Sequence, residues 1–84
     1  MSYEIRFTRE AFKDVKKLSS KLQKKLHEII TSRIVNQPYA GKKLVGDLSG
    51  FFSVRLSYQD RIIYTVDEEN KTIFIHRAKT HYGA

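Results

Sequence analysis

The chain has 84 residues, and its 16 Lys and Arg against 9 Asp and Glu give a formal net charge of +7. This length fits a single domain over residues 1–84, and 40% hydrophobic residues are too many for a disordered chain. The excess positive charge favours a polyanionic partner. The absence of cysteine excludes disulfides and thiolate metal sites, and no apolar run is long enough for a membrane span or a secretion signal. We therefore expect a cytoplasmic protein.

The N-terminal half is predicted to form one strand followed by a helical hairpin. Apolar and polar residues alternate over residues 2–7, which predicts a half-buried strand. Thr8 is then placed to cap a first helix. A capping-box pattern begins at Ser20, and apolar residues at helical spacing predict a second helix to about Asn36. Pro38 prevents that helix from continuing.

The C-terminal half changes to the two-residue period of strands. Alternation over residues 52–56 and 61–66 predicts two strands joined by a tight turn, and a third strand is expected over 72–77. Residues 51–77 are therefore predicted to form an antiparallel meander, and a weaker strand is expected over 43–48. The order strand, two helices, then several strands predicts an α+β domain in which both helices pack on one face of the sheet.

Lysine is concentrated in the predicted helical hairpin, where residues 13–25 contain only one acid, Asp14. A solvated outer face of the helices explains this cluster. The functional alternative is a surface that contacts phosphates without reading the sequence of a nucleic acid. The lysines are Lys13, Lys16, Lys17, Lys21, Lys24 and Lys25.

Further cations lie on the predicted strands. If the apolar residues of the first two meander strands face the helices, Arg55 and Arg61 point to the open face of the sheet. In the third strand either the odd-numbered or the even-numbered residues of 73–77 face the core, and both arrangements remain open. Arg55 and Arg61 also have a structural interpretation, as surface charges that pair with acidic neighbours. The residues expected on one concave surface are Lys42, Lys43, Arg55, Arg61, Arg77, Lys79, His81 and Tyr82.

Such a surface permits RNA cleavage without a cofactor. Arg, Lys, His and Tyr with few carboxylates make a poor site for Mg²⁺ or Zn²⁺, and the scattered His27, His76 and His81 do not form a zinc motif. RNA carries its own nucleophile in the 2′-hydroxyl, so the protein must supply a base, an acid and cations for the phosphorane. Arginine binds phosphate oxygens well, and histidine transfers protons near neutral pH. These residues by themselves indicate a nucleic-acid-binding domain and permit a nuclease.

Three segments of the C-terminal half are distinctive: Leu48-Ser49-Gly50-Phe51-Phe52, Arg61-Ile62-Ile63-Tyr64 and His81-Tyr82. Together with the order of elements, they resemble the RelE/ParE superfamily of bacterial toxins, nearest to its YoeB/Txe and RelE branches. The resemblance implies the RelE-like fold over the whole chain. It also implies a toxin of a type II toxin–antitoxin system, an mRNA interferase that cuts the message in the ribosomal A site by 2′-hydroxyl attack without metal.

The same resemblance implies roles for individual residues. Arg61 corresponds to the arginine that stabilises the transition state. His81 corresponds to the C-terminal acid, with Tyr82 as its aromatic neighbour. Arg55 and Arg77 match basic positions that grip the message or the scissile phosphate.

The general base is where the chain departs from the YoeB branch. That branch has a glutamate shortly before the Leu-Ser-Gly segment, whereas this chain has Lys42-Lys43-Leu44-Val45-Gly46 there. The lysine-rich sites of the RelE branch resemble a solution in which Lys43 or Lys42 is the base, and His81 is the alternative. The choice stays open, with Lys43 counted among the catalytic candidates. Lys42 is otherwise expected, with Lys79, to contact RNA.

The resemblance also implies a protein partner, a small acidic antitoxin that wraps the basic surface. Two other functions are alternatives to the nuclease. One is inhibition of DNA gyrase, as in ParE-like toxins, against which the terminal His81-Tyr82 argues. The other is a non-catalytic module that binds RNA or the ribosome, which the missing glutamate favours.

Overall fold

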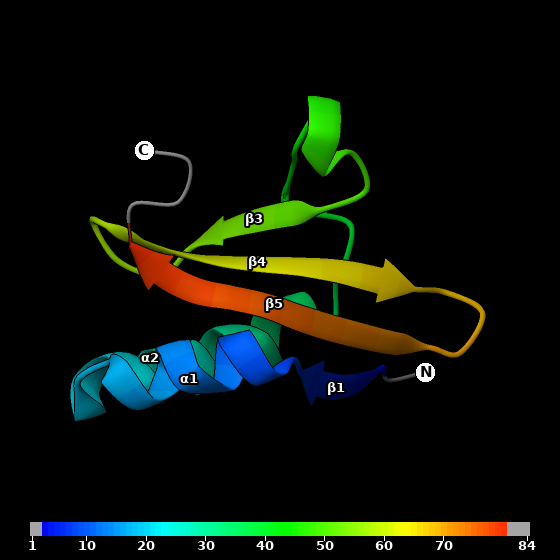
Figure 1. The fold of residues 1–84 in the computed structure, drawn as a ribbon. Coiled ribbons are helices and arrows are strands. Elements are labelled where there is room, and N and C mark those ends of the chain that lie inside the picture. Colours follow the sequence, from blue (N-terminus) through cyan, green and yellow to red (C-terminus); the bar gives the residue numbers. More distant parts are fainter. Residues whose placement is uncertain (1–2, 81–84) are drawn as a thin grey trace.

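The computed structural model describes residues 3–80, which form a five-stranded sheet with two α-helices on one side of it (Figure 1). The predicted α+β class, with a strand, two helices and then a meander, is confirmed. The elements in chain order are β1 (Glu4–Phe7), α1 (Arg9–Lys17), α2 (Ser20–Ile29), the π-helical turn η1 (Ile30–Ile34), β2 (Lys42–Lys43), the 3₁₀ turn η2 (Gly46–Leu48), β3 (Phe52–Arg55), β4 (Asp60–Asp67) and β5 (Thr72–Thr80).

Both α-helices begin at a residue whose hydroxyl caps the first turn. Thr8 accepts a hydrogen bond from the backbone N–H of Ala11 at 3.1 Å, as predicted. The cap of α2 is Ser19, which accepts from the N–H of Leu22 at 3.2 Å. The prediction that Ser20 fills this role is wrong by one residue, because Ser20 already has its place inside the helix.

The sheet has the order β1-β5-β4-β3-β2, in which β1 is parallel to β5 and the other neighbours are antiparallel. The meander of β3, β4 and β5 is the predicted one. The weak strand expected over residues 43–48 is shorter and begins earlier, at Lys42–Lys43. Three residues later Gly46 adopts a φ of +69°, in the left-handed region that favours glycine, and starts η2.

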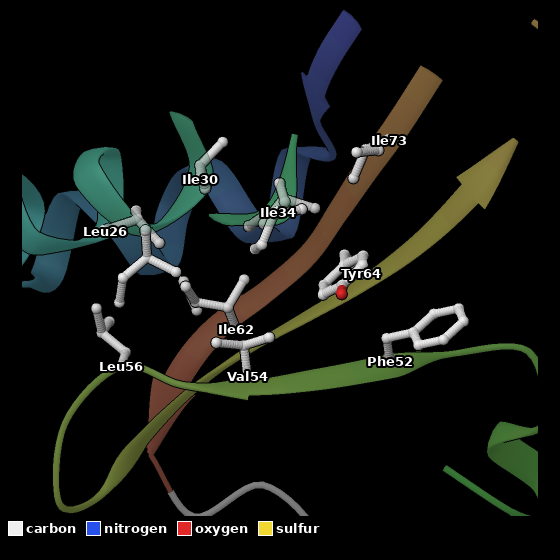
Figure 2. Packing of buried hydrophobic residues seen from close by; sticks show 13 residues of the cluster. Leu26, Ile30, Ile34, Phe52, Val54, Leu56, Ile62, Tyr64 and Ile73 are labelled. Atoms are coloured by element: carbon white, nitrogen blue, oxygen red, sulfur yellow. The ribbon is translucent and has the colours of Figure 1, made fainter. Parts of the chain in front are cut away.

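The hydrophobic core lies between the sheet and the helices. Leu26 and Ile34 from the helical side point toward Val54 and Ile62 on the strands, and Ile30 belongs to the same buried cluster (Figure 2). Burial of such side chains stabilises a fold by about 1.5–3 kcal/mol each. In residues 3–80 the helices are too short or too polar to cross a membrane.

Tyr64 fixes the connection between η1 and β2 against the core. Its side chain is fully buried, and its hydroxyl donates a hydrogen bond to the carbonyl of Pro38 at 2.8 Å. A Cβ atom at Gly41 would lie only 2.6 Å from the Tyr64 hydroxyl oxygen. The close approach of this connection to β4 therefore requires glycine at position 41.

A β-bulge interrupts the pairing of β4 with β5. Tyr64 lies opposite Ile75, whereas Ile63 lies opposite Arg77, so His76 is an extra residue on β5. A bulge of this kind reverses the alternation of side chains beyond it.

The bulge determines which side chains of β5 face the helices. Ile75 and Ala78 are both fully buried in the core although they are three residues apart. Arg77 and Lys79 therefore point to the opposite face of the sheet. Neither arrangement considered for this strand is right along its whole length, because each assumes an unbroken alternation.

Candidate functional site

Three cations lie side by side across the face of the sheet that the helices leave open. Arg55 on β3 lies directly opposite Arg61 on β4, and Arg61 lies directly opposite Lys79 on β5. Val54, Ile62 and Ala78, each next to one of the three in sequence, are buried in the core, so the three side chains point away from the helices. This arrangement agrees with the direction expected for Arg55 and Arg61. We call these three residues the cationic row.

Within residues 3–80, none of the members of the cationic row lies within 4.0 Å of a carboxylate oxygen, although Lys79 is near enough to Asp14 to help lower the pKa of that carboxyl. The structural alternative of pairing with acidic neighbours is thus not realised there. Arg61 Nη1 donates a hydrogen bond to Ser53 Oγ at 3.3 Å, which orients the central guanidinium. Like charges directly opposite on neighbouring strands repel, so a bound phosphate would relieve a repulsion as well as gain charge-assisted hydrogen bonds.

Arg77 lies on the same face, but carboxylates of α1 offset its charge. Its Nε donates to Asp14 Oδ2 at 2.8 Å, and its Nη2 donates to Asp14 Oδ1 at 3.3 Å. Glu10 Oε1 lies 3.8 Å from Arg77 Nη1. The predicted grip of Arg77 on RNA stays a prediction.

Asp14 also supplies a hydrogen-bond acceptor to the backbone of β5 beyond the point where β1 ends. The pairing of β1 reaches only Ile75, and α1 continues beside the rest of β5 (Figure 1). There Asp14 Oδ2 accepts a hydrogen bond from the backbone N–H of Ala78 at 3.1 Å. Burial alone would raise the pKa of Asp14, but the hydrogen bonds from Arg77 and Ala78 lower it overall. Sequence reasoning treated Asp14 as a lone acid among lysines and missed this contact.

The register of β2 places the two candidate lysines on opposite faces of the sheet. Lys42 lies opposite Ser53, which shares the face of Arg61, whereas Lys43 lies opposite Phe52. Phe52 belongs to the core, on the other face. Directly opposite residues share a face, so Lys42 is the lysine on the side of the cationic row. The expectation that Lys43 converges there is wrong, because a shift of one residue moves every side chain of a strand to the other face.

His76, the extra residue of the bulge, is a further feature of the open face. One of its ring nitrogens, Nε2, lies 2.9 Å from Thr65 Oγ1. Its ring meets the ring of Phe51 edge-to-face, with centroids 5.0 Å apart. Burial lowers the pKa of His76, so its neutral form is favoured. The sequence gives no signal for this environment, since it depends on the bulge.

Two predicted catalytic residues, His81 and Tyr82, lie outside the described residues, and their roles stay predictions. Across residues 3–80, His, Asp and Glu side chains do not gather in threes as a metal site requires. The lysines of the helical hairpin are all exposed, which suits either of the interpretations given to them.

The chain belongs to the ParE-like toxins of type II bacterial toxin–antitoxin systems, whose family model matches residues 5–82. It is therefore a member of the RelE/ParE superfamily, as the resemblance of its motifs indicated.

Individual relatives come from the RelE and YoeB branches. Toxin RelG of Mycobacterium tuberculosis is 33% identical over 78 residues, which are 92% of this chain and 88% of that protein. A chain of the toxin–antitoxin complex RelBE2 from the same organism has a TM-score of 0.86 at 30% identity, covering 96% of this chain and 100% of its own. The YoeB dimer of Staphylococcus aureus gives a TM-score of 0.79 at 34% identity, with coverages of 95% and 98%. The similarity thus extends over nearly the whole length of each.

Proposed function

We propose that this toxin is a ribosome-dependent endoribonuclease that cuts mRNA in the ribosomal A site without a metal ion. The observation that carries the proposal is the cationic row, because three adjacent cations on an open sheet face fit the phosphates of a single RNA strand. The similarity to RelG and YoeB toxins supports it. A cytoplasmic location follows from this target.

The reaction divides between phosphate chemistry and proton transfer. The 2′-oxygen of the substrate bonds to the adjacent phosphorus, and the bond from phosphorus to the 5′-oxygen of the next nucleotide breaks. The products are a 2′,3′-cyclic phosphate and a 5′-hydroxyl. Arg61, oriented by Ser53, is assigned to the extra negative charge of the phosphorane, and Arg55 and Lys79 to the flanking phosphates.

Two proton transfers complete the reaction. His81 is assigned to protonate the departing 5′-oxygen, with Tyr82 beside it, as the resemblance implies. Of the two lysines, Lys42 is the stronger candidate for the base, because it shares the face of Arg61 and Lys43 does not. A matched pair of variants at these adjacent positions separates the two assignments.

The partner proposed for this face is an acidic antitoxin. This chain is similar to a chain of the toxin–antitoxin complex RelBE2 of Mycobacterium tuberculosis and to a chain of the YoeB–YefM complex of Staphylococcus aureus. A chain with a formal charge of +7 attracts an acidic segment at long range, and the cationic row gives its carboxylates specific partners. Antitoxin binding would then cover the residues assigned to RNA.

The test is translation of a defined message by purified ribosomes with added toxin, followed by primer extension to map cuts. We expect cuts in the A-site codon that need ribosomes and persist in chelator. Arg61→Gln should slow cleavage about 10²–10³-fold, the usual cost of removing one transition-state contact. The matched control is Arg33→Gln, which changes an exposed arginine of η1 on the helical side. Lys42→Ala should slow cleavage strongly and Lys43→Ala only slightly.

An intact message at saturating toxin would refute the nuclease. A gyrase supercoiling assay and ribosome co-sedimentation would then distinguish the gyrase inhibitor from the non-catalytic binding module. Equal cleavage by the Arg61 and Arg33 variants would instead remove Arg61 from the mechanism while leaving the activity established.

A further inference from the structure

A hollow of about 410 Å³ lies on the open face beside the cationic row. This volume is within the range of small-molecule sites, about 300–1,000 Å³. Ile63, only 1% exposed, belongs to its lining, and the start of α1 lies at one side. The lining residues are Thr8, Arg9, Glu10, Leu48, Phe51, Ile63, His76 and Arg77.

Two aromatic rings of the hollow are held in fixed orientations. The His76 ring is anchored through Nε2 to Thr65 Oγ1 at 2.9 Å, and the Phe51 ring meets it at an interplanar angle of 61°. Leu48 adds a further apolar side chain. Rigid aromatic and aliphatic side chains around an open space favour a flat, largely apolar guest, since little side-chain entropy is lost on binding.

Among the lining residues of the hollow, Arg77, His76 and Glu10 offer little to a phosphate, and Arg9 is the one that would attract it. The guanidinium of Arg77 is already engaged by Asp14 at 2.8 Å and has Glu10 at 3.8 Å. His76 is kept in its neutral form by burial, which lowers its pKa. An anion would therefore gain little from Arg77 and His76 and would meet the Glu10 carboxylate. A neutral planar group meets no such penalty.

The register links the hollow to the phosphate site. Ile63 is two residues from Arg61 on β4, and Arg77 is two residues from Lys79 on β5. Two residues of a strand span about 7 Å. A nucleotide whose phosphate contacts Arg61 can place its base at this distance, on the same face of the sheet.

We propose that this hollow is a nucleobase subsite, in which Phe51 and His76 receive the base of a nucleotide next to the scissile phosphate and set the nucleotide preference of cleavage. The inference rests on the proposed function, because it takes the cationic row as the phosphate site. Arg9, which also lines the hollow, offers a guanidinium plane for stacking on the same base.

The direct test is binding of 2′-O-methylated trinucleotides, which cannot be cleaved, to the isotope-labelled toxin without ribosomes. We expect NMR shifts at the Ile63 methyl groups and the His76 ring. Phe51→Leu and His76→Gln should each weaken binding at least about fivefold, the lower limit for losing one base–aromatic stack. The glutamine amide can still reach Thr65. The matched control is Phe12→Leu, which changes an exposed aromatic of α1 that does not line the hollow and should leave binding unchanged.

The second test compares cutting rates on ribosomes among messages that differ only in one A-site base. Phe51→Leu and His76→Gln should reduce the ratio of cutting rates between the best and the worst A-site base at least threefold. Phe12→Leu should leave that ratio unchanged. No shifts, shifts away from the hollow, or equal binding by all variants would overturn the base subsite. Trinucleotide binding at the hollow by a toxin that cuts no message would refute the nuclease, and with it the role in cleavage preference, while leaving the hollow as a base-binding site.

Discussion

Replacing Asp14 by alanine tests how the open face is held to α1. The substitution removes the acceptor of the Ala78 N–H, which is buried, and costs about 1–3 kcal/mol for the unsatisfied donor. It also removes the charged hydrogen bonds to Arg77, worth about 1.5–3 kcal/mol. These contributions share one carboxylate and are not additive, so we expect a loss of about 3 kcal/mol. A domain of 84 residues has about 4–13 kcal/mol of stability in total.

The assay is urea unfolding followed by circular dichroism, with two graded controls. Asp14→Asn keeps one carbonyl oxygen for the Ala78 N–H and should lose about 1–2 kcal/mol. Glu10→Gln removes a distant, exposed partner of Arg77 at 3.8 Å and should lose less than about 0.5 kcal/mol. Equal losses for Asp14→Ala and Glu10→Gln would refute the reasoning, since they would show that burial of the carboxylate and its bond to the backbone contribute nothing.

The pH dependence of the stability of Asp14→Asn tests the role of Asp14 independently. The folded-state pKa of Asp14 lies below its unfolded value of about 3.9, because the bonds from Arg77 and Ala78 outweigh the effect of burial. Its contribution to stability is therefore complete above about pH 4 and is lost as the pH falls through the folded pKa. The difference in unfolding free energy between wild type and Asp14→Asn should shrink over that acidic window. A constant difference down to the acid limit would contradict the assignment.

Three further perturbations test other parts of the molecule. Burial lowers the folded pKa of His76, so stability should fall on acidification below about pH 6.5, and His76→Gln should remove that part of the unfolding profile. The hydrogen bond to Glu68 raises the pKa of Tyr39 to about 12, so Glu68→Gln should lower the midpoint of its phenolate titration in near-ultraviolet absorbance. Gly41→Ala should cost about 1–3 kcal/mol in thermal unfolding, because its Cβ would meet the buried Tyr64 hydroxyl at 2.6 Å; a neutral result would show that the connection moves freely.

The sequence was sufficient for the features that depend on local periodicity. Helical spacing located both α-helices, and alternation located β3 and β4 and the direction of Arg55 and Arg61. A two-residue strand such as β2 carries too little pattern to fix its register, and a shift of one residue exchanges the faces of Lys42 and Lys43. The role of Asp14 depends on where β1 ends beside β5, a tertiary contact that no local pattern contains.

The bulge at His76 shows why one extra residue matters to the whole open face. In an unbroken strand, Arg77 and Lys79 would share the face of Ile75 and point into the core, where unpaired charges are costly. The extra residue reverses the alternation, so Ala78 fills the core and Lys79 joins Arg61 in the cationic row. The residue that produces this reversal has its own ring in the hollow beside the row. A single irregularity therefore connects the proposed phosphate site with the proposed base subsite, and bulges commonly serve to re-aim side chains in this way.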